Sequence, residues 1–311
     1  MEGPLPGKHL LVASTGGHLA QLARWSTIIG SSSDSLWITF ESPQSDSLLQ
    51  NSRALYVPYV ASRDVSATIG AFIKMMKSIN WREENFISAV TTGAAVGLAG
   101  LAAARLHRVP AYYFESVSRV NGPSLTGRLA SIDPWIHTYC QYQNYATGRW
   151  KFRSPLLDSF EAISAPVNPH PRLFVTLGTI VPYRFDALVD GILETGLADA
   201  RTVWQLGSTE RRSLPGRTVT QLSAAEFDQC VQEADIVITH AGVGTVMHLL
   251  EMGIYPVVVP RRANRREHVD DHQVQISMLI TAREIGAVCD AEKLNRQFII
   301  DATSKRIKNT K

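Results

Sequence analysis

Short apolar runs alternate along the chain with longer segments that carry apolar residues on one helical face, and glycine- or serine-rich turns separate them. Short β-branched or aromatic runs are typical of strands buried in a parallel sheet. We predict strands over 8–13, 36–40, 54–57, 86–90, 109–115, 135–140, 172–177, 201–206, 217–220, 235–239 and 256–260. We predict helices over 19–29, 65–79, 185–195, 224–233, 245–252 and 291–311, and one after Gly93. This alternation predicts an α/β fold with parallel sheets and crossover helices.

A chain of 311 residues is long enough for two domains of about 150 residues each. A run without clear periodicity, 154–171, contains four prolines and is typical of a linker. We therefore predict an N-terminal domain over 1–155 and a C-terminal domain over 156–311. Both halves begin with a strand, a glycine turn and a helix, so we expect two Rossmann-like, doubly wound domains that face each other across a cleft.

Composition and charge restrict the classes of partner. The chain carries a net charge of +3 with a pI near 8.8, which suits anionic small molecules or a lipid surface and does not require nucleic acid. Cys140, Cys230 and Cys289 are too widely spaced for a disulfide framework or a metal signature, and we expect a reducing compartment. Residues 1–7 lack the charged and apolar regions of a signal peptide.

Residues 86–104 carry no charge over nearly the length of a transmembrane helix. Thr91, Thr92 and Gly93 interrupt this stretch, and alanine and glycine, which contribute little to membrane insertion, dominate the rest. We therefore predict a strand, a turn and a small-residue helix that packs closely on the sheet.

The strongest candidate for ligand binding lies over 236–260, which reads as strand, glycine turn, helix and strand. Gly242 and Gly244 allow the backbone to approach a ligand closely, and the helix that follows directs free N–H groups toward an anion. Glu251 is placed to accept hydrogen bonds from a ribose diol. The alternative is an ordinary βαβ unit with a solvated Glu251.

A polar cluster follows the next strand, where doubly wound sheets bind ligands. Its members are Arg261, Arg262, Asn264, Arg265, Arg266, His268, Asp270, Asp271, His272 and Gln273. The four arginines can bind a carboxylate on a sugar, or they can form a solvated surface loop.

Two segments of the C-terminal half resemble the donor-binding half of GT-B glycosyltransferases of family 28. They are 174–186, with the motif FVTLGT followed by FD, and 240–273, with HAGVGT, EMG, PVVVP and DHQ. In the N-terminal half, STGGH at 14–18, FESVSRV at 114–120 and LTGR at 125–128 resemble the membrane-associated partner subunit of two-subunit enzymes. Those enzymes extend polyprenyl-diphosphate-linked sugars, and they include N-acetylglucosaminyltransferases and exopolysaccharide glucuronosyl- or galactosyltransferases. The chain resembles a fusion of both subunits.

The resemblance implies an inverting UDP-sugar-dependent hexosyltransferase that acts on a polyprenyl-diphosphate-linked saccharide in exopolysaccharide or glycolipid biosynthesis. The N–H groups of Gly242, Val243, Gly244 and Thr245 would hold the diphosphate, with help from Thr179 and Arg184. Glu251 would bind the ribose, His272 and Gln273 would contact the donor sugar, and His240 would line the pocket. The implied acceptor site includes Gly16, Gly17 and Arg119.

The transfer needs a base for the acceptor hydroxyl. His18 is the first candidate, since histidine titrates near the working pH; its alternative roles are to cap the helix or to bind the acceptor phosphate. Glu115 is the second candidate, and its alternative role is an ion pair with Arg119. Helix N-termini and arginines can stabilise the leaving diphosphate, so we expect no metal and no cofactor besides the UDP-sugar.

A lipid-linked acceptor requires contact with a membrane surface. Residues 68–81 combine large apolar side chains with Lys74, Lys77 and Trp81, which suits an interfacial helix or an ordinary packing helix. Residues 149–153 form a second basic and aromatic patch of the same kind. The partner subunits of the resembled enzymes carry an N-terminal anchor that this sequence lacks. We therefore expect a cytoplasmic protein attached peripherally to the inner face of the cytoplasmic membrane.

Three other functions stay open. A GT-B UDP-sugar epimerase would share the glycine turn and the ribose carboxylate but would not need the segment from Glu115 to Arg119. A non-catalytic nucleotide-sugar-binding subunit is possible as well, although the presence of His18, Glu251 and Gln273 disfavours it. A dinucleotide oxidoreductase is disfavoured because 14–18 lacks the third spaced glycine.

Overall fold

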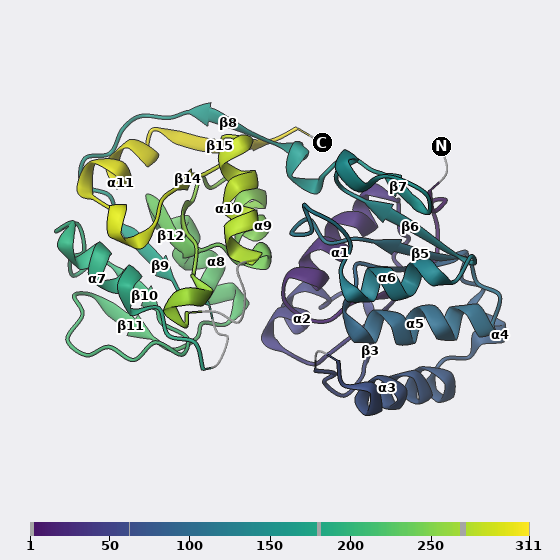
Figure 1. Ribbon diagram of the computed structural model, residues 1–311. Coiled ribbons are helices and arrows are strands. Elements are labelled where there is room, and N and C mark those ends of the chain that lie inside the picture. Colours follow the sequence, from purple (N-terminus) through teal and green to yellow (C-terminus); the bar gives the residue numbers. More distant parts are fainter. Residues whose placement is uncertain (1–2, 62, 179–181, 268–271, 311) are drawn as a thin grey trace. The chain divides into compact units, whose positions relative to one another are not determined.

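The computed structural model describes residues 3–61, 63–178, 182–267 and 272–310. The chain divides into two compact units, unit 1 (Met1–Leu156) and unit 2 (Leu157–Lys311) (Figure 1). The cleft expected between the two units stays a prediction.

Unit 1 contains a seven-stranded sheet in the order β3-β2-β1-β4-β5-β6-β7, with every neighbouring pair parallel. Its strands are β1 (His9–Val12), β2 (Leu36–Thr39), β3 (Arg53–Tyr56), β4 (Ser88–Thr91), β5 (Ala111–Phe114), β6 (Ile136–Cys140) and β7 (Trp150–Phe152). Its helices are α1 (Gly17–Ile28), α2 (Pro43–Leu48), α3 (Val65–Ser78), α4 (Trp81–Glu84), α5 (Ala94–Leu106) and α6 (Leu125–Ile132), with the short 3-10 helix η1 (Gln143–Tyr145).

Helices cover both faces of this sheet. Figure 1 shows α3, α5 and α6 along one face, where Leu10 and Val12 of β1 join the core with Met75 of α3. On the other face, Trp25 of α1 stacks on Phe114 of β5 with ring centroids 4.4 Å apart. The unit is therefore doubly wound.

The uncharged stretch 86–104 forms β4, a turn and most of α5, as predicted. Glycines let α5 lie close to the sheet, because a Cβ at Gly97 would lie 2.4 Å from the Thr91 hydroxyl and one at Gly100 would lie 2.6 Å from Val12. Among the helices of the described residues, none is long and apolar enough to cross a membrane.

Unit 2 contains a six-stranded parallel sheet in the order β11-β10-β9-β12-β13-β14. Its strands are β9 (Leu173–Thr176), β10 (Val203–Gln205), β11 (Arg217–Val219), β12 (Ile236–His240), β13 (Val257–Val259) and β14 (Ala287–Val288). Its helices are α7 (Asp186–Glu194), α8 (Ala224–Glu233), α9 (Val243–Glu251), α10 (His272–Ala282) and α11 (Arg296–Ala302), with 3-10 turns η2 (Leu156–Ser159), η3 (Ala263–Arg265) and η4 (Ala291–Lys293). Two doubly wound α/β domains confirm the predicted fold class.

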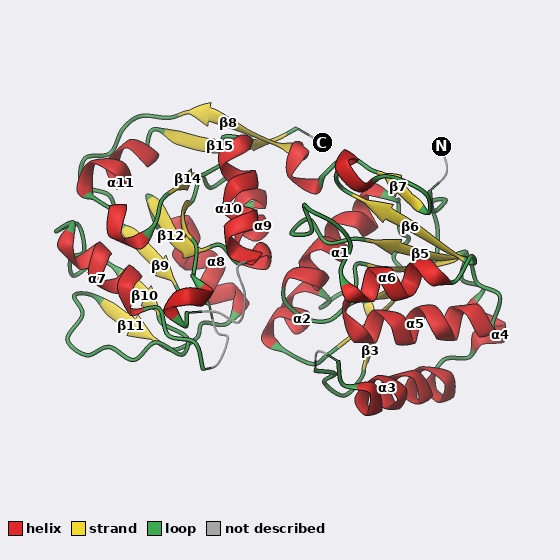
Figure 2. Ribbon diagram, in the orientation of Figure 1, coloured by secondary structure: helices red, strands yellow, loops and turns green. Residues whose placement is uncertain are grey.

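The C-terminal prediction of one helix over 291–311 is wrong. Only α11 is helical beyond the η4 turn, and β15 (Lys305–Asn309) pairs antiparallel with β8 (Phe160–Ser164) (Figure 2). Strand β8 lies inside the run 154–171, whose composition is typical of a linker. Ile307 of β15 is buried, and its N–H donates to the carbonyl of Gly253. This pairing joins segments far apart in the chain, so local periodicity does not predict it.

Candidate active site

In each sheet the strand order reverses beside the first strand. In unit 1 the reversal lies between β1 and β4, and in unit 2 it lies between β9 and β12. In doubly wound sheets, ligands bind at the carboxyl ends of the strands at such a switch point. The turns at 14–17 and 92–93 occupy this position in unit 1, and those at 177–178 and 241–242 occupy it in unit 2.

His18, in the first turn of α1, lies at the switch point of unit 1. Its Nδ1 lies 2.9 Å from the carbonyl oxygen of Thr92, and the Thr92 hydroxyl donates to the carbonyl of His18 at 2.8 Å. A carbonyl oxygen only accepts, so Nδ1 of the neutral ring carries the proton and Nε2 carries the lone pair. Nε2 makes no hydrogen bond to any residue that the structure describes. The arrangement leaves one basic nitrogen free.

The surroundings of His18 are crowded. Gly93, with φ of 119°, has no room for a side chain, since a Cβ there would lie 3.0 Å from both His18 Cε1 and the Tyr113 hydroxyl. Burial and the charge of Arg119 lower the pKa of His18 below its usual value, against an opposing effect of the Thr92 carbonyl. The imidazole is therefore neutral at neutral pH, as a general base must be.

Two glutamines hold the glycine turn before His18. Gln44 of α2 accepts from the N–H of Gly16 at 2.5 Å and donates to its carbonyl at 3.1 Å. Gln21 of α1 donates to the carbonyl of Gly17 at 3.0 Å. A Cβ at Gly16 would meet nothing within 4 Å, so the backbone at this turn borders open space.

Glu115, which follows β5, is buried with both oxygens occupied. Oε1 accepts from the Ser116 N–H at 3.0 Å and the Tyr113 hydroxyl at 3.2 Å, and Oε2 accepts from the Ser124 N–H at 2.8 Å and its hydroxyl at 3.1 Å. Burial raises its pKa, which these donors and the charge of Arg119 oppose. Glu115 thus closes the loop 116–124 onto the first turn of α6.

That loop is also held by two sets of contacts that are not predicted from the sequence. Gln21 accepts from the Val117 N–H at 2.8 Å and donates to the Ser116 hydroxyl at 3.1 Å. In the segment after β6, four side chains each donate a hydrogen bond to a backbone carbonyl of 115–120. They are Gln141, Tyr142, Asn144 and Tyr145. Nothing local in the sequence indicates these contacts.

Arg119 lies on this loop, half-buried. Its backbone is anchored, because its carbonyl accepts from the Tyr145 hydroxyl at 2.7 Å. Within the described residues its guanidinium donates no hydrogen bond and forms no ion pair, although its charge reaches His18 and Glu115. Gly16, Gly17, His18, Glu115 and Arg119, all predicted as site residues, therefore share one end of the sheet, and the Arg119 cation is available to an anion.

His240, the last residue of β12, lies at the switch point of unit 2 and is only 8% exposed. Glycines enclose its ring, since a Cβ at Gly178 would lie 2.6 Å from His240 Nε2 and one at Gly242 would lie 2.3 Å from it. Helix α9 begins directly afterwards at Val243, and its first intrahelical bond within this turn runs from Val246 N–H to Gly242 carbonyl. The N–H groups of Val243, Gly244 and Thr245 thus form the open N-terminus expected of an anion site.

Arg261, which follows β13, is fully buried and organises the same end of unit 2. It donates to the carbonyls of Leu177 at 2.6 Å and Tyr183 at 2.7 Å, and its guanidinium lies 5.2 Å from the ring centre of Phe185. Burial lowers its pKa to about 10, so it stays charged at neutral pH. Gln273 accepts from the Arg261 N–H at 3.0 Å.

The other arginines of the polar cluster divide between internal ion pairs and solvent. Arg262 pairs with Asp290 at 2.5 Å and Arg265 with Glu292 at 2.8 Å, whereas Arg266 is exposed. Arg184 pairs with Asp186 at 2.8 Å and donates to the carbonyl of Glu210.

Some predicted donor residues are less well defined. Glu251 is the exposed last residue of α9. Thr179, His268, Asp270 and Asp271 lie outside the described residues, and of His272 only the backbone, at the start of α10, is described. In the described part of the chain, no group of three or more histidine, cysteine, aspartate or glutamate side chains could hold a metal ion. The expectation that no metal is needed stays a prediction.

Residues 203–305 match the family model of the glycosyltransferase family 28 C-terminal domain. This match lies wholly within unit 2. No curated protein matches the sequence.

Solved structures share the fold of nearly the whole chain. MurG of Acinetobacter baumannii has a TM-score of 0.54 and 18% identity, over 95% of this chain and 93% of its own. The glycosyltransferase SsfS6 of Streptomyces sp. SF2575, solved with thymidine diphosphate, has a TM-score of 0.52 and 16% identity, over 95% of both chains. A putative UDP-N-acetylglucosamine 2-epimerase of Listeria monocytogenes has a TM-score of 0.54 and 11% identity, over 90% of this chain and 88% of its own. The chain therefore has the GT-B fold, and the family 28 match together with this fold supports a glycosyltransferase.

Proposed function

We propose that the protein is an inverting glycosyltransferase that moves a sugar from a UDP-sugar to a polyprenyl-diphosphate-linked saccharide. The observation that carries the proposal is the geometry of His18. A neutral imidazole is anchored through Nδ1 at the switch point, close to two glycines and to Arg119. Neither Nε2 of this imidazole nor the Arg119 guanidinium bonds to any of the described residues, and a match to the family 28 C-terminal domain follows in the same chain.

The donor binds to unit 2 in this proposal. The N–H groups of Gly242, Val243, Gly244 and Thr245 hold the diphosphate at the N-terminus of α9, where the helix dipole favours negative charge. Glu251 accepts from the ribose hydroxyls. Gln273 and His272 contact the sugar, Thr179 and Arg184 assist at the diphosphate, and His240 keeps the two glycine turns apart.

The acceptor binds to unit 1. Its diphosphate is held by the N–H group of Gly17 and by the guanidinium of Arg119. Gly16, whose own N–H already donates to Gln44, shapes the turn that borders the diphosphate. Glu115 is a positioning residue, because its four hydrogen bonds hold the loop that carries Arg119 and leave no lone pair directed at a substrate.

In the reaction, Nε2 of His18 accepts the proton of the acceptor hydroxyl while that oxygen forms a bond to the anomeric carbon of the donor sugar. The bond from the anomeric carbon to the diphosphate oxygen breaks, and UDP leaves with the electron pair. Attack opposite the leaving group inverts the anomeric configuration. The N-terminus of α9 stabilises the charge that develops on the diphosphate, and we expect no metal requirement.

Unit 1 also carries the surface that we propose contacts the inner face of the cytoplasmic membrane. Helix α3 buries Ala71 and Met75 and exposes Val65, Ile69 and Ile73, with Lys74 and Lys77 also exposed. Trp81 stacks on His107 with ring centroids 4.4 Å apart, so it packs within the unit. An apolar stripe beside lysines suits an anionic lipid surface.

The test is a transfer panel with purified protein and the UDP forms of glucose, N-acetylglucosamine, galactose and glucuronic acid, each with and without membrane lipid extract. UDP release that needs the lipid extract, persists in a metal chelator and is lost in His18→Gln supports the proposal. His170→Gln, at an exposed histidine of unit 2, is the matched control.

The same panel decides against the alternatives. Conversion of a free UDP-sugar without lipid would identify an epimerase, the activity named for the similar structure from Listeria monocytogenes. UDP binding without turnover of any donor would identify a non-catalytic binding subunit.

A further inference from the structure

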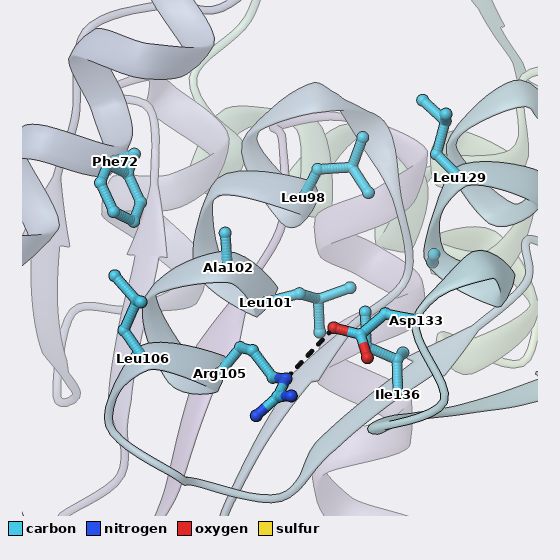
Figure 3. Close-up of a pocket in the computed structure, with 10 residues that line it drawn as sticks. Phe72, Leu98, Leu101, Ala102, Arg105, Leu106, Leu129, Asp133 and Ile136 are labelled. Atoms are coloured by element: carbon cyan, nitrogen blue, oxygen red, sulfur yellow. Dashed lines mark ion pairs between the residues drawn. The ribbon is translucent and has the colours of Figure 1, made fainter.

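An open apolar groove runs along one face of unit 1, away from the switch point. It has a volume of about 470 Å³ and lies over α5, between α3 and α6. Figure 3 shows Phe72 and Leu129 on opposite sides of Leu98 and Ala102. Among the described residues that line it, Arg105 and Asp133 are the charged ones, and they pair with each other at 3.4 Å. The remaining wall therefore offers no charge to a ligand.

The groove leads away from the candidate acceptor site. Helices α5 and α6 both begin at the carboxyl edge of the sheet. Helix α5 begins one residue after Gly93, where an added Cβ would lie 3.0 Å from His18, and α6 begins beside Glu115. Both helices then run toward the opposite edge. Leu98 lies one turn into α5, and Leu125, Leu129 and Ile132 lie on one face of α6, all three exposed. Leu125, in the first turn of α6, therefore presents an exposed apolar side chain on the same helical face as Leu129, which lines the groove.

We propose that this groove holds the first isoprene units of the acceptor's polyprenyl chain. The inference rests on the proposed function, which places the acceptor diphosphate at Gly16, Gly17 and Arg119. A chain attached to that diphosphate must leave the site, and the apolar side chains from Leu125 to the Arg105–Asp133 pair give it an apolar path of about 20 Å, the length of the thirteen-residue helix α5. A surface that binds a protein partner usually has polar groups around an apolar centre, whereas the lining of this groove is apolar apart from the Arg105–Asp133 pair.

This groove differs from the exposed stripe of α3. Ile69 and Ile73 lie on the outside of α3 and suit contact with a bilayer surface, whereas Phe72 of the same helix lines the groove. A variant that fills the groove without removing apolar surface can therefore separate chain binding from membrane adsorption.

The experiment uses Ala102→Trp, because Ala102 is exposed and lines the groove, so an indole there occupies the space without disturbing the core. Leu129→Asp makes the wall polar at a second position. Ile69→Trp, which adds the same indole outside the groove, is the matched control. Each variant is assayed with a long-chain polyprenyl-diphosphate acceptor in detergent and with a short, water-soluble prenyl analogue.

We expect Ala102→Trp and Leu129→Asp to raise the KM for the long-chain acceptor by about tenfold, the effect of losing one to two buried methylenes. Their KM for the short analogue, their kcat and their UDP affinity should match the wild type. Equal losses with both acceptors, or an equal loss in Ile69→Trp, would overturn the proposal.

A binding measurement separates this proposal from the proposed function. A benzophenone-bearing prenyl diphosphate is photo-crosslinked to the protein, and the modified peptides are mapped. Labelling within α5 and α6 that Ala102→Trp removes supports the groove even if no donor sugar is transferred. Labelling elsewhere, or a dimer that Ala102→Trp converts to a monomer in size-exclusion chromatography, would overturn it, the latter because a second copy would then occupy the groove.

Discussion

The two switch points have the same topology, but their histidines have different environments. In unit 1, His18 lies in the first turn of a helix and is half-buried, and its ring donates a single hydrogen bond to the Thr92 carbonyl at the end of the neighbouring strand. In unit 2, His240 is the last residue of a strand, and its ring fills the space between Gly178 and Gly242. The same topology thus gives one ring with a free basic nitrogen and one ring that shapes the backbone around it.

This difference teaches what a switch point contributes to function. The sheet brings helix N-termini and glycine turns to one place in both units, which suits the binding of a phosphate group. Whether that place also carries a reactive group depends on how one side chain is anchored. We therefore propose that unit 1 carries out proton transfer and that unit 2 binds the nucleotide.

Replacing the two histidines tests this division most strongly. His18→Gln should lower kcat by about 10²–10⁴-fold, the usual contribution of a general base, with UDP affinity unchanged. His240→Gln should weaken UDP binding by displacing the two glycine turns. Steady-state kinetics and calorimetry with UDP measure both. A loss of UDP affinity in His18→Gln equal to its loss of kcat would contradict the assignment.

His9, at the opposite end of β1 from His18, tests what burial alone does to an imidazole. It is fully buried, bonded through Nδ1 to the Ser88 hydroxyl at 2.8 Å, and burial lowers its pKa to about 4. The unfolded chain takes up a proton at this histidine near pH 6.5, so stability is complete above that pH and falls as the pH drops toward 4. Over this pH range the free energy of unfolding falls by about 3 kcal/mol.

The variant His9→Asn should flatten this part of the pH dependence and leave the pH profile of kcat unchanged. Urea unfolding at several pH values between about 4 and 7 measures the first effect. The exposed His170→Asn should retain the wild-type slope. A shift in the kcat profile of His9→Asn would show that His18 is not the only imidazole that the reaction uses.

The strands around the switch points could be predicted from the sequence because their signals are local. Runs such as 36–40 and 236–240 are apolar on both faces, and Gly93 and Gly242 mark the turns that follow strands. The helix α2 was missed although its signal is present, since Ser42 forms a capping box with Ser45 and Pro43 occupies the first turn. Strand β15 carries no such signal, because its partner β8 lies at the other end of unit 2.

The residues of the candidate site also fall into those that a local motif predicts and those that only long-range contacts reveal. The glycine turns, His18, Glu115 and Arg119 lie in short recognisable motifs. Gln44, Gln21 and Gln141 bond to residues 4 to 96 positions away, with only the Gln21–Gly17 contact local. An isolated glutamine has no pattern that announces such a role, so the groups that hold the site could be found only once the chain was folded.

A smaller effect is expected at the glycines around His240. A Cβ at Gly242 would lie 2.3 Å from the ring, while its φ of −76° is ordinary, so the clash is the whole cost of Gly242→Ala. Overpacking of this kind costs about 1–3 kcal/mol, seen as a lower Tm. The double variant His240→Ala, Gly242→Ala should be less destabilised than the sum of the single variants. Additive losses would mean that the ring is not what excludes a side chain.

The last comparison concerns the two candidate bases within unit 1. In Glu115→Gln the amide places N–H donors against the N–H of Ser116 or Ser124, so one buried hydrogen bond is lost at a cost of about 1–3 kcal/mol. The loop that carries Arg119 is then less firmly held, and the KM for the acceptor should rise by about tenfold while kcat changes little. Glu161→Gln, at an exposed glutamate of β8, should have neither effect. A fall in kcat as large as that of His18→Gln, with KM retained, would instead make Glu115 the base.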